Sequence, residues 1–214
     1  TQFNAEKNYL KYVTKGWDLL KPKETYNESL TDNNPYEGKL YKKAPFMPYN
    51  LQDMYDANDA GILRSTPYGN NLLADFAKKA IALNDTEDSY YELLAEAEAN
   101  LGHIEASSDA YRKAIELSPT IVDYWLNWSL IYYEEREYET ALHIMEDALL
   151  EVPNEADLYY RTTVYLLKLG RMKEAVSHLE IAYSLNPETH EQIYPFFPDI
   201  EIQKNLFKLI QMIK

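Results

Sequence analysis

Several residue types and motifs are missing from this sequence of 214 residues, and each absence excludes a class of protein. There is no cysteine, which excludes disulfide scaffolds, Cys-ligated zinc sites and thiol nucleophiles. Glycine occurs only 6 times, and neither Gly-rich phosphate-binding motif, GxxxxGK(S/T) or GxGxxG, is present. No stretch approaches the roughly 18 apolar residues of a membrane-spanning helix. Because the chain starts at Thr1 and not at methionine, its compartment stays open.

Histidine is also scarce, and the four histidines show no metal-binding pattern. No two of them have the i, i+4 spacing that binds zinc on one helix. The serines stand beside no recognisable base, and the run EEREYE at 134–139 is typical of a solvated turn rather than an acid–base pair. We therefore expect a protein that is not an enzyme and that binds no metal or cofactor.

Negative charge is abundant and concentrated in one part of the chain. The net charge is −14, and residues 88–188 carry 20 acidic against 7 basic residues, whereas residues 1–87 carry 12 against 11. An acidic body of this kind repels a phosphate backbone, so we expect no nucleic-acid partner.

A pattern of 34 residues returns three times in the acidic part. The segment RKAIELSPT at 112–120 is followed by EDALLEVPN and then by EIAYSLNPE. Each unit predicts a helix, a tight turn, a second helix and a proline that ends it. The aligned columns are Ala114, Ala148 and Ala182, the turn residues Gly102, Arg136 and Gly170, and Pro119, Pro153 and Pro187.

These columns resemble the tetratricopeptide repeat (TPR) family over about residues 88–187. The resemblance implies an all-α fold: a right-handed superhelical array of antiparallel helix pairs. Ser129 and Thr163 stand where the family prefers glycine, and Arg136 replaces a turn glycine. These departures affect local packing and not the assignment.

The flanking segments extend the array. Residues 51–87 predict a degenerate helix pair, with helices over about 51–63 and 70–85. Residues 1–50 predict a helix followed by a loop rich in Pro and Asn, which could lie in the groove of the array. In residues 188–214, Pro195 and Pro198 interrupt any helix, and residues 200–214 predict a capping helix over the last apolar face.

The resemblance also implies a binding surface, because the first helix of each pair lines the concave side of such arrays. In this family the groove typically holds a peptide or helix of another protein. One branch of the family clamps an acidic chaperone tail, but here Glu92, Glu96 and Asp157 stand at three of its five positions and would repel that tail. The expected groove residues are Glu92, Glu96, Asn100, Asp123, Asn127, Tyr133, Glu134, Asp157, Tyr160, Arg161 and Lys168.

The sequence thus predicts a non-catalytic scaffold that binds a basic or neutral segment of another protein in an acidic concave groove. The alternative is a structural spacer or a self-associating array within a larger assembly. An apolar face left uncovered at one end would favour the alternative, and the helix expected over residues 200–214 covers one end.

Overall fold

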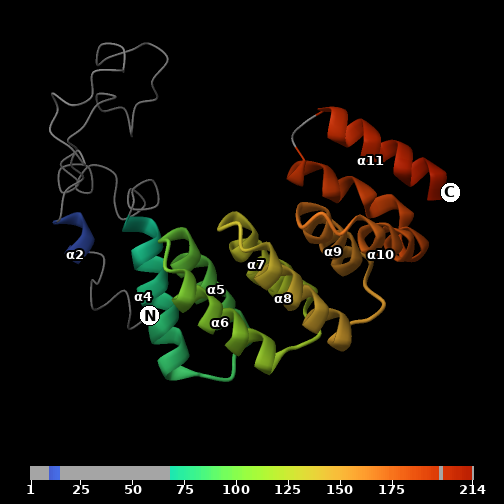
Figure 1. The fold of residues 1–214 in the computed structure, drawn as a ribbon. Coiled ribbons are helices and arrows are strands. Elements are labelled where there is room, and N and C mark those ends of the chain that lie inside the picture. Colours follow the sequence, from blue (N-terminus) through green and yellow to red (C-terminus); the bar gives the residue numbers. More distant parts are fainter. Residues whose placement is uncertain (1–9, 15–67, 198–199, 214) are drawn as a thin grey trace, which may run out of the picture.

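The computed structural model describes residues 10–14, 68–197 and 200–213, and every regular element in these residues is a helix. Figure 1 shows the helices following one another as a curved array, with α4 at one end and α10 at the other. No helix among the described residues is long and apolar enough to span a membrane. The elements are α2 (Leu10–Val13), α4 (Tyr68–Leu83), α5 (Asp88–Asn100), α6 (Ile104–Leu117), α7 (Val122–Glu134), α8 (Tyr138–Glu151), α9 (Ala156–Lys168), α10 (Met172–Leu185), the 3₁₀ helix η4 (Pro187–Phe196) and α11 (Ile200–Ile213).

The pairs α5/α6, α7/α8 and α9/α10 are the three predicted repeats, and each turns at a residue of positive φ. Gly102 has φ 76°, Arg136 has φ 64° and Gly170 has φ 73°. The left-handed conformation lets the next amide reach back over five residues to close the helix, as in Arg171 N to Leu166 O at 2.9 Å. The predicted turn column is therefore confirmed, including the arginine.

The alanine column lets the helices approach closely. Ala114, Ala148 and Ala182 are all fully buried, in one continuous core with the inner helices. Each of the six paired helices also carries an acidic residue in its first turn, where it stabilises the positive end of the helix dipole.

A recurring hydrogen bond fixes the start of each first helix. Trp125 Nε1 donates to the carbonyl of Pro119 at 2.8 Å, and Tyr159 OH donates to that of Pro153 at 3.0 Å. One repeat earlier, Tyr91 OH donates to the carbonyl of Asp85 at 3.2 Å. The main-chain carbonyl of Asp85 therefore accepts the same bond as the carbonyls of the prolines in the later repeats, which explains how α4 joins the array without a proline.

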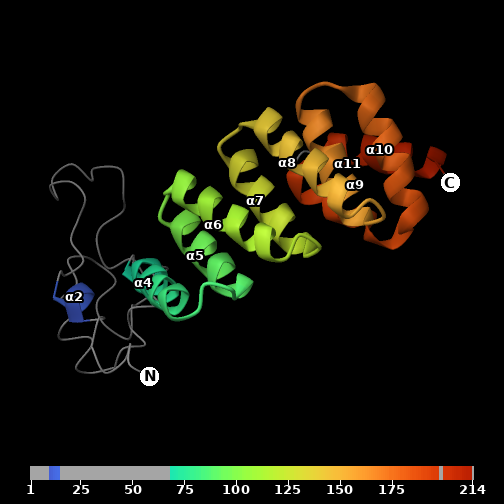
Figure 2. The same cartoon turned by 90° about the horizontal axis from the view of Figure 1, so that it is seen from below.

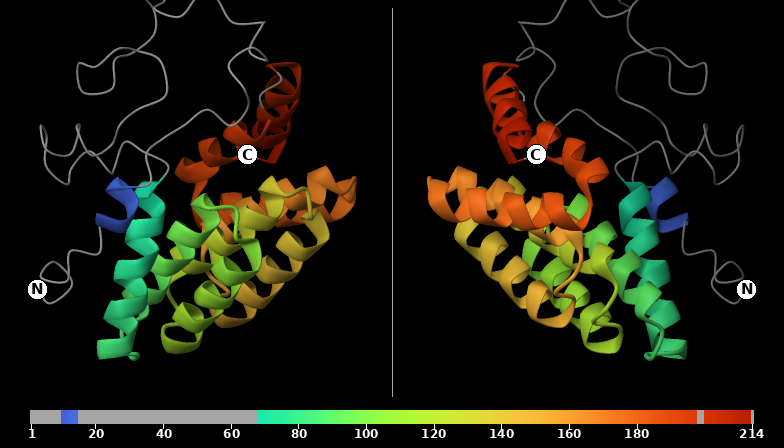
Figure 3. Two further views of the ribbon diagram at one scale, coloured as in Figure 1. Left: turned by 90° about the vertical axis from the view of Figure 1, so that its left-hand side faces the viewer. Right: turned by 90° about the vertical axis from the view of Figure 1, so that its right-hand side faces the viewer.

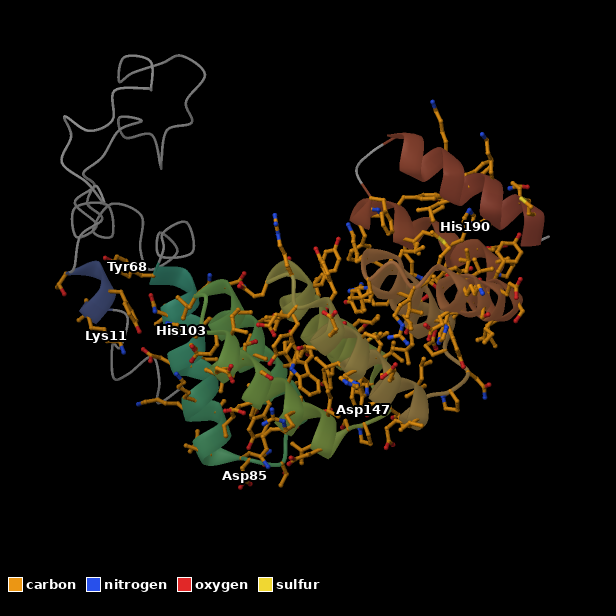
Figure 4. The ribbon with its side chains drawn as sticks, viewed as in Figure 1. Lys11, Tyr68, Asp85, His103, Asp147 and His190 are labelled. Atoms are coloured by element: carbon orange, nitrogen blue, oxygen red, sulfur yellow. The ribbon has the colours of Figure 1, made fainter. Side chains whose placement is uncertain are left out.

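At the N-terminal end of the array, polar contacts join α4 to α5 on one side and to α2 on the other. The Glu98 carboxylate of α5 is only 4% exposed; it accepts from Lys78 Nζ of α4 at 2.6 Å and lies 2.7 Å from His103 Nδ1. On the outer side of α4, Tyr12 OH of α2 donates to Asp75 at 2.5 Å and its ring stacks on Tyr68. Figure 4 shows Lys11 of α2 and Tyr68 together at this end. The helix expected over 51–63 and the loop of residues 22–50 lie outside the described residues.

The C-terminal end differs from the prediction in one respect. Pro195 was expected to interrupt helical structure, yet it lies inside η4. A 3₁₀ helix is wound more tightly than an α-helix, and η4 has Pro187 in its first turn. Leu206 and Ile210 of α11 are 5% and 0% exposed and belong to the core, so the capping helix is confirmed. Figures 2 and 3 show η4 and α11 on one side of the array at its C-terminal end.

Candidate protein-binding surface

The predicted groove residues all lie on the first helices of the pairs. Glu92, Glu96 and Asn100 are on α5; Asp123, Asn127, Tyr133 and Glu134 are on α7; Asp157, Tyr160, Arg161 and Lys168 are on α9. The structure separates them into two parts with different chemistry. We call the residues of α5, together with Asp123, Asn127 and Glu134, the acidic half, and Tyr133 with the residues of α9 the C-terminal half.

The acidic half brings carboxylates of two helices close enough to influence one another. Burial, followed by the negative charges of Glu96, Asp123 and Asp88, raises the pKa of Glu92 above its usual range. Asp88 is better satisfied, since hydrogen bonding from Ser118 holds its pKa below the usual range. Glu92 thus lies in a field of like charge from α5 and α7.

Besides burial, the negative charges of the acidic half also raise the pKa values of two tyrosines. Burial, with the charges of Asp88 and Glu92 next, raises the pKa of Tyr124 to about 12. Burial also raises the pKa of Tyr111 on α6, and the charges of Glu96 and Glu92 add to the effect. The outermost members, Glu96, Asn100, Asp123 and Glu134, are exposed. The acidic half is therefore an accessible surface that disfavours further negative charge.

The C-terminal half is covered by the chain itself. The ring of Phe196 lies edge-on to Tyr133, with centroids 5.1 Å apart, and Tyr133 OH donates to the Phe196 carbonyl at 3.3 Å. Tyr133 also stacks on Tyr165 of α9 at 5.6 Å. The segment that follows α10 therefore reaches across α9 to α7.

The cations of α9 hold this segment. The Arg161 guanidinium lies 4.6 Å from the Phe196 ring centroid, and Lys168 Nζ lies 4.7 Å from that of Phe197. Both distances are in the range of cation–π contacts. Asp157 accepts a hydrogen bond from Gln192 Nε2 at 2.6 Å. With Tyr133, four predicted groove residues thus do contact a peptide segment, but one of this chain.

Tyr160 requires a correction, because it is fully buried and not available to a partner. Its hydroxyl donates to the Asn186 carbonyl at 2.8 Å. The helical spacing placed it beside the groove, but the chain folds back over α9 after α10 and covers it. Val164, one turn further along α9, is also fully buried.

Sequence reasoning missed Gln192, Phe196 and Phe197 as partners of the groove residues. The available signal was the segment IYPFFP at 193–198, in which two aromatic residues stand between prolines. In the described residues, no group of three or more His, Asp or Glu side chains could hold a metal ion.

Comparisons with characterised enzymes match only a short part of the chain. Eighty residues are 41% identical to a calcium-transporting ATPase of Myroides odoratus, covering 37% of this chain and 15% of that protein. A similar match, 41% over 81 residues, links 37% of the chain to 15% of the alkaline phosphatase PafA of Elizabethkingia meningoseptica. The chain thus spans only a small share of these relatives, and such a match does not show catalysis here.

Solved structures share the fold. A crystal structure of MamA has a TM-score of 0.51 and 15% identity, covering 72% of this chain and 92% of MamA. MamA 41-end from Desulfovibrio magneticus RS-1 has a TM-score of 0.50 and 16% identity, covering 75% and 92%. Residues 76–186, slightly more than half of the chain, match the family described as PRP39 N-terminal HAT repeat. The repeats, their helix pairs and this match together show that the chain belongs to this family of TPR-like repeats and has the architecture of a protein-interaction scaffold.

Proposed function

We propose that the chain is a non-catalytic scaffold that binds a basic segment of another protein on its acidic half. The observation that carries the proposal is the position of Glu92, half-buried between α5 and α7 in the field of Glu96, Asp123 and Asp88. Asn127 lies within this half and is able to bond the backbone of a bound segment.

The raised pKa of Glu92 gives the proposal an energetic basis. A carboxylate whose folded pKa lies above its unfolded value costs free energy whenever it is ionised in the folded protein. That cost is present in full above the raised folded pKa, declines as the pH falls below that value, and is gone below the unfolded pKa. Burial causes the larger part of this cost, and a partner does not relieve that part. The smaller part comes from repulsion by Glu96, Asp123 and Asp88, and a lysine or arginine of a partner offsets it at neutral pH, which favours binding.

Helix stability alone explains only part of the arrangement. Asp123 lies in the first turn of α7, where an acid stabilises the helix. Glu92 and Glu96 lie in the interior of α5, where a like-charge pair four residues apart is destabilising. The acidic half is therefore best explained by a partner of opposite charge.

The test compares two variants with equal changes in charge. The inner variant carries Glu92→Lys, Glu96→Lys and Asp123→Lys; the outer variant carries Glu139→Lys, Asp147→Lys and Glu180→Lys on the exposed surface of α8 and α10. Figure 4 shows Asp147 on the side of the array away from α11. Both variants and the unchanged chain are used for affinity capture from an extract of the producing cells, at low and moderate salt, with quantitative mass spectrometry.

We expect proteins with basic segments that the unchanged chain and the outer variant capture and the inner variant loses, with capture weakening at moderate salt. Equal capture by both variants, each shown to be folded by circular dichroism, would contradict the proposal. Asp157 is left unchanged, because Gln192 already occupies it.

The alternative of a self-associating array has one observation in its favour. Leu83 and Leu150, which lie near the ends of α4 and α8, are 80% and 81% exposed and offer apolar contact area to a second copy. Light scattering over a hundredfold range of protein concentration tests it: a mass that rises with concentration supports self-association, and a constant monomer mass excludes it.

A further inference from the structure

The segment after α10 departs from the path that a further repeat would take. Adding 34 to the position of Tyr159, whose hydroxyl closes the start of α9, gives Ile193, so η4 stands where the next inner helix would begin. η4 packs on α9, as a continued inner helix would, but Phe196 also reaches past α9 and contacts Tyr133 on α7.

The contacts of this segment are those of a recognised peptide. Gln192 donates to Asp157, the Phe196 carbonyl accepts from Tyr133, and the rings of Phe196 and Phe197 lie against Arg161 and Lys168. An amide donor, a main-chain acceptor and two aromatic faces are each matched by a different group of α7 or α9. Apolar covering of the core, to which Ile193, Leu206, Ile210 and the ring of Phe197 contribute, needs none of these polar matches.

The charges of the C-terminal half support the same reading. Arg161 and Lys168 are cations on an array that is otherwise strongly acidic, and both are only half-exposed. Cation–π contacts strengthen when the pair is partly desolvated. Arg161 and Lys168 therefore favour the binding of aromatic rings in the C-terminal half, next to the acidic half.

We infer that residues 192–197 are a built-in ligand, and that the C-terminal half is a second binding site, separate from the acidic half, for a partner segment of the same chemistry. That segment is short and tightly turned, with an amide side chain followed four and five residues later by two adjacent aromatic side chains. Its binding competes with the chain's own segment, so the site is occupied at rest and opens only to a partner that displaces residues 192–197.

The test supplies the segment in trans. The probe is a fluorescently labelled peptide of residues 190–197, HEQIYPFF, and its binding to the full chain is followed by anisotropy. The chain with Phe196→Ala and Phe197→Ala should bind the peptide about tenfold or more tightly than the unchanged chain, because its own segment no longer competes. Adding Arg161→Glu to the double variant should remove that gain, and a peptide with alanine at both aromatic positions should not bind.

A folded double variant that does not bind the peptide would overturn the inference. If the double variant does not fold, the unchanged chain decides the matter: excess peptide should accelerate hydrogen exchange in residues 187–197, and no acceleration overturns the inference. Dimers of the unchanged chain that dissociate on adding the peptide would show that a second copy, and not a partner protein, supplies the segment, which also overturns it. None of these outcomes depends on the acidic half, so the proposed function is tested independently.

Discussion

Arg136 holds a backbone conformation that glycine holds in the two neighbouring repeats. Its φ is 64°, against 76° for Gly102 and 73° for Gly170. The left-handed region costs a residue with a Cβ atom about 1–2 kcal/mol, whereas glycine loses about 0.5–1 kcal/mol through its greater freedom in the unfolded chain. The difference predicts that Arg136→Gly raises the free energy of unfolding by about 0.5–1 kcal/mol.

Urea denaturation followed by circular dichroism measures this effect, provided that the slope of free energy against urea stays unchanged. For a chain of this size, 1 kcal/mol shifts the thermal midpoint by about 2–4 °C. The matched control is Glu135→Gly: Glu135 has φ −75°, an ordinary helical value, so glycine there only adds freedom to the unfolded chain and should destabilise.

The charge of Arg136 has to be separated from its backbone strain. Arg136 stands between the acidic residues Glu135 and Glu137, and its removal increases their repulsion. Repeating the denaturation at about 1 M salt, where the screening length falls to about 3 Å, suppresses this contribution. An Arg136→Gly variant no more stable than the unchanged chain at high salt, beside a destabilised Glu135→Gly variant, would refute the reasoning.

Three further predictions concern the core and its pH dependence. Ser129→Ala should cost about 1–3 kcal/mol of unfolding free energy, more than the ~1 kcal/mol of Tyr165→Phe. In the Tyr165→Phe variant Ser129 keeps its bond to the Leu126 carbonyl, whereas in the Ser129→Ala variant the buried hydroxyl of Tyr165 loses its 2.8 Å partner. Urea denaturation of both variants decides the order. Burial raises the pKa of Glu98, but its bonds to Lys78 and His103 outweigh this and hold the pKa below its usual 4.5. The ionised Glu98 therefore stabilises the fold above pH 4.5, and this stabilisation is lost as the pH falls through the lowered folded value. Thermal scans between pH 7 and 3 should show a drop in the melting temperature that Glu98→Gln reduces, and an equal drop in both proteins would contradict the assignment. Ile210→Ala should lower the free energy of unfolding by about 2–5 kcal/mol and make α11 unfold first. Hydrogen exchange should then be faster in residues 200–213 than in α5. Uniform acceleration would show that α11 does not unfold separately.

The repeat columns carried most of the fold. Alanine, turn and proline positions fix the helix pairs locally, so their spacing was sufficient to place α5 to α10. The arginine turn was predictable for the same reason, since the column demands the conformation whatever residue occupies it. Asp85 was predictable in place but not in mechanism, because the bond that it accepts from Tyr91 involves its main-chain carbonyl.

The candidate site was predictable only where the array stays uncovered. Helical spacing predicted one acidic surface on α5 and α7, and the structure brings Glu96 and Asp123 close enough to Glu92 for their charges to act on it; that a partner binds there stays a prediction. It failed for Tyr160, because the burial of this residue depends on where the chain goes after Pro187. A proline indicates that a helix ends, but it does not give the direction of the next segment. The contact between Phe196 and Tyr133 joins residues 63 apart, beyond the reach of any local pattern.

The buried bond between Ser129 and Tyr165 has a consequence for the order of the repeats. One repeat earlier, the corresponding residues are Ala95 and Ile131, both buried and both apolar. The inner helices thus carry polar groups at one junction and apolar groups at the other. Exchanging two repeats would set a tyrosine hydroxyl against an alanine methyl group and remove the 2.8 Å hydrogen bond that this hydroxyl makes with Ser129. The three repeats are therefore not interchangeable, because the buried contacts between neighbouring repeats depend on their order. A rearranged gene with the same three repeats would encode a less stable protein.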